Sequence, residues 1–231
     1  MTRSAKVELY HKLAEKRKEC RLCSTSVENY SQRPNACSAN VECLSFSEAW
    51  QSNLSPKIML IDSEGGFQIS FDRRSGQFDE NLPFIRNLRI LLNSIGFDPG
   101  TPSDPKHQPL FFYSLPLCFY RSRLSDAERD RTSSTCAEEF LPKAVDLLRP
   151  KVIICVGAKV FKQTARVLGG GKVPSLAKHI SEGGPVLCPD FDTSLFGVFS
   201  FNGLGEQKRS IEAQVEDWRR IGTYHCFDFH R

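Results

Sequence analysis

The sequence lacks any apolar run close to the length of about eighteen residues that a membrane-spanning helix needs. Its first residues, MTRSAKVELYHKLAEKRKEC, lack the uninterrupted apolar stretch of a secretory signal peptide, because Lys, Arg and Glu recur throughout them. The chain also has no internal repeat and no low-complexity tract. These absences predict a soluble, cytoplasmic protein with no membrane contact.

A strong charge imbalance is absent as well. The 31 Lys and Arg residues nearly match the 27 Asp and Glu residues, which leaves a formal net charge of +4. Such a balance excludes a polycation that binds nucleic acid through charge alone, but it permits a more selective contact. With 231 residues, 40% of them apolar, the chain can bury one substantial core, so we predict a single monomeric domain over residues 1–231.

Cysteine, in contrast, is plentiful. The nine cysteines are an odd number, and they occur in a chain without an export signal. Disulfides need an oxidising compartment, and they are most useful to domains too small to build a sufficient core. The sequence therefore favours thiols that stay reduced or bind a metal.

Short apolar runs alternate along the chain with stretches of helical periodicity. Runs rich in Ile, Val and Leu that end in glycine or polar residues are typical of buried parallel strands. Their alternation with helices predicts a three-layer α/β/α fold with a mostly parallel, four-stranded central sheet. The predicted strands are 57–61, 110–117, 151–156 and 195–201, and the predicted helices are 6–19, 82–95, 134–148, 158–168 and 206–221. Residues 24–56, rich in Ser, Asn, Gln and Pro, are predicted to form a surface loop insertion.

Four cysteines lie at the borders of predicted elements. Cys20 and Cys23 follow the first helix, Cys118 follows the second strand, and Cys136 opens the helix 134–148. Thiolates bind iron and zinc, and the Cys-x-x-Cys spacing places two of them on one turn. Four sulfurs can therefore converge, and spacing alone leaves open an iron–sulfur cluster, a structural zinc ion, or buried thiols without metal.

Taken in order, these motifs resemble the iron–sulfur branch of the uracil-DNA glycosylase superfamily, families 4 and 5, over nearly the whole chain. Besides the Cys-x-x-Cys pair, the matching motifs are KIMLIDSEGG, LLNSIGF, YSLPLC, CAEEFLPKAVDLLRPKVII and VGAKVF. The resemblance implies a uracil-DNA glycosylase-like fold and DNA as the partner. It also implies a 4Fe-4S cluster held by Cys20, Cys23, Cys118 and Cys136.

The first catalytic motif departs from the family pattern. The family places a Gly-Glu-x-Pro-Gly turn after the first strand, and its acid orients water or stabilises the sugar cation. Here Asp62 stands at the first Gly and Ser63 at the acid, followed by the glycine turn Gly65 and Gly66. Asp62, our first choice, or Glu64 can supply the carboxylate, and the alternative for both is an ordinary turn carboxylate or helix N-cap.

The groups that would hold the base differ as well. Ser114 stands where the family uses Asn to read uracil, and Asn202 stands where it uses His to support the departing base. Serine is shorter and makes no bidentate amide pair, which implies a wider pocket, and Asn can donate to a base carbonyl but cannot carry a proton. Phe78 is the counterpart of the aromatic ring that stacks on the flipped base. The alternatives are an ordinary Asn-Gly turn at Asn202 and plain core packing for Phe78.

Basic residues are predicted to contact the DNA backbone. Lys208 and Arg209 follow the Asn202 turn, where the family inserts a loop into DNA. A glycosylase must grip phosphates on both sides of the flipped nucleotide, so we assign this contact to Lys208, Arg209 and the Gly65–Gly66 turn. The alternative for the basic pair is a solvated surface.

Ser63, Ser114 and Asn202 replace the three groups that contact uracil or the reaction centre in the family. The resemblance therefore implies a monofunctional DNA glycosylase that excises a modified or damaged base other than plain uracil and leaves an abasic site. A bulky hypermodified pyrimidine of phage DNA would suit the wider pocket and would indicate antiviral defence, and DNA repair by base excision stays open beside it. The alternatives are a non-catalytic DNA-binding or damage-sensing iron–sulfur protein of the same fold, and a zinc-stabilised protein without a nucleic-acid role.

Overall fold

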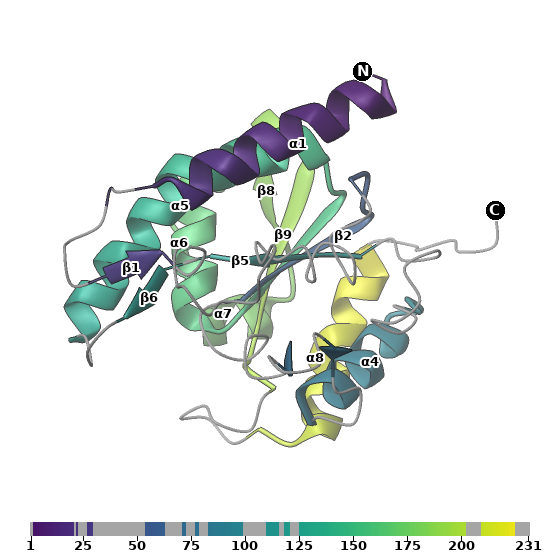
Figure 1. Ribbon diagram of the computed structural model, residues 1–231. Helices are drawn as coiled ribbons and strands as arrows, with labels where there is room; N and C mark the ends of the chain where they lie inside the picture. Colours follow the sequence, from purple (N-terminus) through teal and green to yellow (C-terminus); the bar gives the residue numbers. More distant parts are fainter. Residues whose placement is uncertain are drawn as a thin grey trace.

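In the computed structural model, five strands form the central sheet in the spatial order β5-β2-β7-β9-β8 (Figure 1). Neighbours within β5, β2, β7 and β9 are parallel, whereas β8 runs antiparallel along the edge beside β9. The strands are β2 (Ile58–Asp62), β5 (Leu110–Ser114), β7 (Val152–Val156), β8 (Val186–Cys188) and β9 (Thr193–Val198). The structure describes residues 2–20, 22, 27–29, 54–62, 71–72, 77–78, 83–98, 110–115, 118–120, 125–201 and 209–224.

The predicted α/β class is confirmed, but the predicted count of four strands is wrong. All four predicted strands are present as the parallel ones, and β8 is the addition. This edge strand has three residues, and Leu187 at its centre is exposed. Because its apolar run has only three residues and lies between Pro185 and Pro189, its sequence is indistinguishable from that of a loop.

Both faces of the sheet are apolar and buried. Ile58 and Leu60 of β2 pack into the core on one face, whereas Met59 and Ile61 pack into the core on the other. The pleat of a strand sends alternate side chains to opposite sides, so a continuous apolar run requires cover on both faces.

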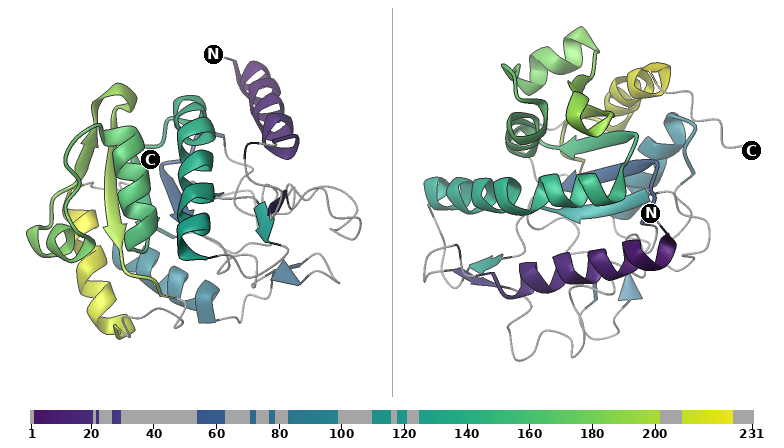
Figure 2. Two further views of the ribbon diagram at one scale, coloured as in Figure 1. Left: turned by 90° about the vertical axis from the view of Figure 1, so that its left-hand side faces the viewer. Right: turned by 90° about the horizontal axis from the view of Figure 1, so that it is seen from above.

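Helices cover both faces of the sheet, so helices, sheet and helices form three layers (Figure 2). One face carries α4 (Pro83–Ser94) and α8 (Ile211–Tyr224), which pack against each other. The other face carries α5 (Asp126–Leu148), α6 (Ala158–Gly169) and α7 (Leu176–Glu182), with α1 (Arg3–Lys18) packed on α5 and a short 3-10 turn, η4 (Pro189–Phe191), before β9. None of the helices within the described ranges is long and apolar enough to cross a membrane.

Helix α5 begins earlier than predicted. The sequence pattern placed its start near Ser134, with Cys136 opening it, but the helix starts at Asp126 and Cys136 lies in its interior. The cause is a capping box, because the Ser125 hydroxyl accepts from the Glu128 backbone N–H while the Glu128 carboxylate accepts from the Ser125 backbone N–H. The Ser-x-x-Glu signal stands in the sequence among many other charged residues.

Two small ribbons lie outside the main sheet. β1 (Val27–Asn29) pairs antiparallel with β6 (Cys118–Tyr120), and β3 (Phe71–Asp72) pairs antiparallel with β4 (Gln77–Phe78). The predicted insertion over 24–56 therefore contains a strand, and its residues 24–26 and 30–53 lie outside the described residues. β1 ties the segment after α1 to the strand that begins with Cys118.

A buried histidine joins α7 to the sheet. Nε2 of His179 accepts a hydrogen bond from the Gly197 N–H at 3.0 Å, and the imidazole lies 4.5 Å from the Phe161 ring. Only a ring nitrogen without a proton can accept that bond. Burial lowers the pKa of His179 from its usual value of 6.5, while the charge of Glu182 acts in the opposite direction.

Folding stability should therefore fall as the pH drops below 6.5. The folded protein takes up this proton less readily than the unfolded chain, so protons favour unfolding in that range. Urea unfolding followed by circular dichroism at about pH 7.5 and about pH 5.5 should show a lower midpoint at the acidic pH. His179→Gln keeps an acceptor but does not titrate, so its midpoint should change less between the two values, and an equal change would contradict this assignment.

Candidate functional site

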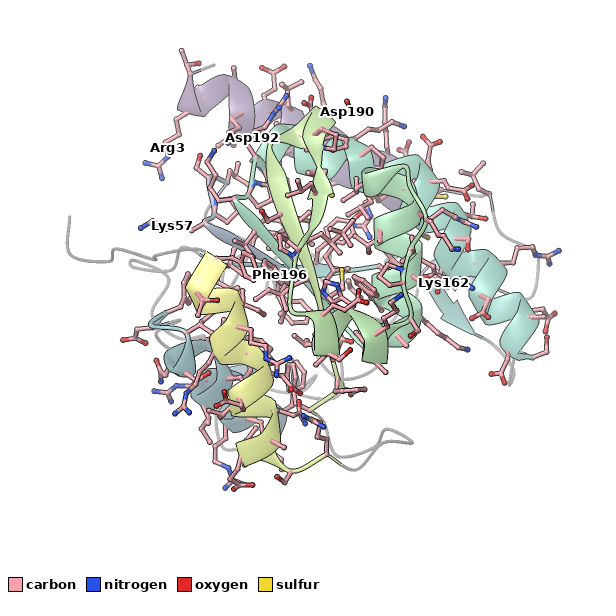
Figure 3. The ribbon with its side chains drawn as sticks, turned by 180° about the vertical axis from the view of Figure 1, so that it is seen from behind. Arg3, Lys57, Lys162, Asp190, Asp192 and Phe196 are labelled. Atoms are coloured by element: carbon pink, nitrogen blue, oxygen red, sulfur yellow. The ribbon has the colours of Figure 1, made fainter. Side chains whose placement is uncertain are left out.

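The carboxyl ends of the parallel strands meet at one edge of the sheet, where the direction of the chain connections reverses. The chain passes from β2 to β5 on one side and then crosses to β7 on the other. Open α/β sheets bind ligands in the crevice at such a switch point. Lys57 and Asp192, which precede β2 and β9, lie toward the opposite end of the sheet (Figure 3). Asp62, the last residue of β2, lies at this carboxyl edge.

Asp62 and Ser114 are direct neighbours at this edge. They are register partners in the parallel pairing of β2 with β5, and the Leu115 N–H donates to the Asp62 carbonyl at 3.0 Å. Both side chains continue the rows of Ile58 and Leu60 and of Leu110 and Phe112, so they point to the face covered by α4 and α8. Asp62 is 4% exposed, so the edge holds a buried carboxyl beside a hydroxyl.

Arg17 of α1 reaches the same edge from the other face of the sheet. Its Nη2 donates to the Ser114 carbonyl at 2.9 Å and lies 3.5 Å from the Leu115 carbonyl. Its guanidinium also sits 4.4 Å from the centre of the Tyr113 ring, in cation–π geometry. Nothing in a Lys- and Arg-rich helix distinguishes Arg17 from its neighbours, so the sequence contained no signal for this contact.

The described cysteines of the predicted metal site come from packed helices. Cys20 directly follows the end of α1, Cys136 lies in α5 at 5% exposure, and α1 packs against α5. The β1–β6 ribbon places Cys118 opposite Asn29, and Figures 1 and 2 show this ribbon at the end of α1, on the side of α5. The fold therefore brings the described segments that carry Cys20, Cys118 and Cys136 to the same side of the molecule.

Tyr113 precedes Ser114 in β5 and packs in the core on the face of the sheet that α5 covers. Burial raises the pKa of Tyr113 to about 12, with the Arg17 charge opposing that rise and the Cys136 thiol adding to it. The Tyr113 hydroxyl is buried and makes no hydrogen bond to any described residue. A buried donor near a cysteine fits a sulfur-rich group, because hydrogen bonds to sulfur are part of how proteins hold such groups.

Only two of the four predicted ligand side chains, those of Cys20 and Cys136, are described. Within the described ranges, no group of three or more His, Cys, Asp or Glu side chains could hold a metal ion. Those ranges include Cys20 and Cys136, whereas Cys23 and the side chain of Cys118 fall outside them. The donor chemistry of the two described thiols and the Tyr113 hydroxyl is compatible with a thiolate-bound group.

Side chains of α4 and α8 bind the chain before and after residues 202–208. The Asn87 amide of α4 donates to the Phe201 carbonyl at 2.9 Å, and the Phe201 ring stacks on Phe84 at 5.1 Å. The buried Gln214 amide donates to the Ser200 carbonyl at 3.4 Å and the Arg209 carbonyl at 3.1 Å. One side chain of α8 thus bonds the chain before and after this segment.

Arg209 itself is engaged within the protein. Its Nε and Nη2 lie 2.7 and 2.8 Å from the two carboxylate oxygens of Asp217, whose side chain is 7% exposed. The guanidinium also lies 5.5 Å from the Phe199 ring centre. A bidentate pair of this kind fixes the guanidinium in direction, which leaves less of it for a DNA phosphate.

Several predicted site residues lie outside the described residues or have side chains that are not described. Of these, Phe78 lies in β4 opposite Phe71, and its side chain is not among those described. The others lie outside the described residues; they are Cys23, Ser63, Glu64, Gly65, Gly66, Asn202 and Lys208.

Comparison of the chain with protein-family models and with curated proteins found no match. An α/β sheet of this kind supports many chemistries, so the fold by itself does not identify a function. The functional argument therefore starts from the arrangement of Asp62, Ser114, Arg17 and the cysteine-bearing segments.

Proposed function

We propose that the protein is a DNA glycosylase of the uracil-DNA glycosylase-like fold, which flips a modified base out of DNA and hydrolyses its N-glycosidic bond. The observation that supports this most is the buried Asp62 carboxyl beside Ser114 at the switch point of the sheet. In the reaction, water bonds to the anomeric carbon of the sugar, the base departs with the bonding electrons and gains a proton, and an abasic site remains.

Asp62 would act on the sugar side of the bond. A buried carboxylate can orient the attacking water and stabilise the positive charge that develops on the sugar as the base leaves. Its neighbour Ser114 would lie against the base, where a hydroxyl occupies less room than an amide. Asn202, which follows the anchored Phe201, would donate to the departing base, and Phe78 would stack on it.

The expected substrate is a bulky modified pyrimidine rather than uracil. A pocket with Ser114 in place of an amide lacks the bidentate group that reads uracil, and it is wider. Hypermodified cytosines of phage DNA match such a pocket, and their excision would give the protein a role in antiviral defence.

We also propose a 4Fe-4S cluster on Cys20, Cys23, Cys118 and Cys136. The packing of α1 on α5, the pairing of β1 with β6 and the buried Tyr113 hydroxyl support this assignment. The cluster would supply a covalent link between segments that are far apart in sequence, and no step of base excision passes through it. A structural zinc ion on the same thiols is the competing assignment.

Asp62→Asn should lower the rate of base release by about a hundredfold or more, because the amide has nearly the same shape but no charge. The assay would use duplexes that contain uracil, ordinary bases or phage-modified cytosines, with abasic sites scored by alkaline cleavage. The matched control is Asp190→Asn, because Asp190 has an exposed carboxylate near the opposite end of the sheet. This variant should retain wild-type rates. If the wild type binds DNA but releases no base, the protein is a DNA-binding or damage-sensing module instead.

Anaerobically purified protein should be brown and should contain iron and sulfide. Cys136→Ala should abolish the visible absorption and the iron content, because one of the four proposed ligands is removed. Cys188→Ala, which changes another buried thiol in the core on the same face of the sheet, should keep both. If the wild type is colourless and contains zinc, the zinc assignment is correct and the cluster assignment is wrong. If the wild type contains no metal, both assignments are wrong.

A further inference from the structure

The only charged side chains of helix α4 are basic, a pattern that it shares with α6, whose Lys159 and Arg166 have acidic partners. Its residues Pro83–Ser94 include Arg86 and Arg89 and no Asp or Glu. Arg86 and Arg89 are separated by three positions, so they lie on one side of the helix, away from the buried Phe84 and Leu88.

Arg86 and Arg89 make no ion pair or hydrogen bond with any residue that the structure describes. Elsewhere on the surface, basic side chains often have acidic partners close by, as in the pairs Arg149–Asp146, Arg166–Glu138 and Arg219–Glu216. A guanidinium that makes no such pair keeps its five donors for a partner with acceptor oxygens, such as a phosphate.

The position of α4 connects this surface to the proposed site. Asn87, between the two arginines, holds the Phe201 carbonyl at the end of β9, and Phe84 stacks on Phe201. α4 also covers the face of the sheet toward which Asp62 and Ser114 point. Arg209, for which the sequence also predicts a DNA contact, is paired with Asp217.

We propose that Arg86 and Arg89 form a phosphate-binding surface on α4 that holds the DNA backbone beside the base pocket. This inference rests on the proposed function and specifies which face of the protein meets its DNA partner. Phosphate contacts position a duplex without reading its sequence, so this surface should bind DNA of any base composition.

The test is binding of an unmodified fluorescent duplex, measured by anisotropy across a series of salt concentrations. Arg86→Gln/Arg89→Gln should weaken binding severalfold and should lower the slope of log affinity against log salt by about 0.9 for each phosphate that the variant no longer neutralises. Arg149→Gln/Arg166→Gln removes the same charge from arginines that already have acidic partners. This control should leave the slope close to the wild-type value.

The outcomes separate this inference from the proposed function. If the wild type binds the duplex and the α4 variant has an unchanged slope, the α4 surface is excluded while glycosylase activity stands. If both double variants lower the slope equally, binding depends on net charge alone and the assignment to α4 is wrong. If the wild type does not bind DNA, the proposed function fails.

A second inference concerns Arg17 and follows from different contacts. Its guanidinium binds the Ser114 carbonyl at 2.9 Å and stacks on Tyr113, and it lies one helical turn before Cys20. We infer that Arg17 is a positioning residue, through which the cysteine-bearing end of α1 fixes Ser114 in the base pocket. The role of Ser114 rests on the proposed function, whereas the coupling rests on these contacts.

Amide hydrogen exchange tests the coupling without any assay of activity. Arg17→Ala should speed exchange in the peptide that contains Leu115, whose N–H bonds to the Asp62 carbonyl, and should leave β7 unchanged. Lys16→Ala, an exposed neighbour on the same helix, should have no effect, and Arg17→Lys should restore part of the protection. Removal of bound metal by a chelator should mimic Arg17→Ala.

Kinetics supply the second readout. Arg17→Ala should lower kcat for base release more than it changes KM for DNA, because it displaces a pocket residue and not the DNA-binding surface. Unchanged exchange at Leu115 in Arg17→Ala would overturn the inference, even if base release were slower. A wild type that shows the exchange effect but no base release would contradict the glycosylase proposal alone.

Discussion

The parallel pairing of β2 with β5 and β7 is the constraint on which the rest of the structure depends. β2 lies between these two strands, and its apolar run is buried on both faces. Its register therefore determines which side chain lies on which face at its carboxyl end. A shift of one residue would move Asp62 to the opposite face, away from Ser114. The burial of Ile58 to Ile61 therefore secures the site as well as the core.

The site edge also depends on elements far away in sequence. Arg17 reaches it from the amino-terminal helix, and Asn87 and Gln214 fasten the chain around the end of β9 from two helices. Each of these contacts joins a side chain to a backbone carbonyl, which fixes strand ends without using the polar groups of the pocket. The edge is thus supported from both faces of the sheet.

The parallel strands were predictable because each is a run of apolar residues bounded by turns, and α4 and α6 were predictable from their helical periodicity and terminal glycines. The start of α5 was not predicted correctly, because a charged first half hides the capping box at Ser125. β8 was not predicted because its three apolar residues, between Pro185 and Pro189, are too few to show a strand pattern. The sequence predicted a DNA contact for Arg209 but not its ion pair with the buried Asp217, because helical periodicity does not show which residue an acid contacts.

The sequence by itself determined the α/β class, the four parallel strands and the placement of Asp62 directly after a strand, because hydrophobic periodicity and strand termination are local properties. It placed Ser114 inside the predicted strand 110–117, whereas the structure ends β5 at Ser114. Only the tertiary structure decided that Asp62 and Ser114 are register partners, that Arg17 binds the Ser114 carbonyl, and that Arg209 pairs with Asp217 while Arg86 and Arg89 make no such pair with described residues. These facts depend on contacts between residues distant in the chain, and such contacts form when separate apolar faces are buried against each other.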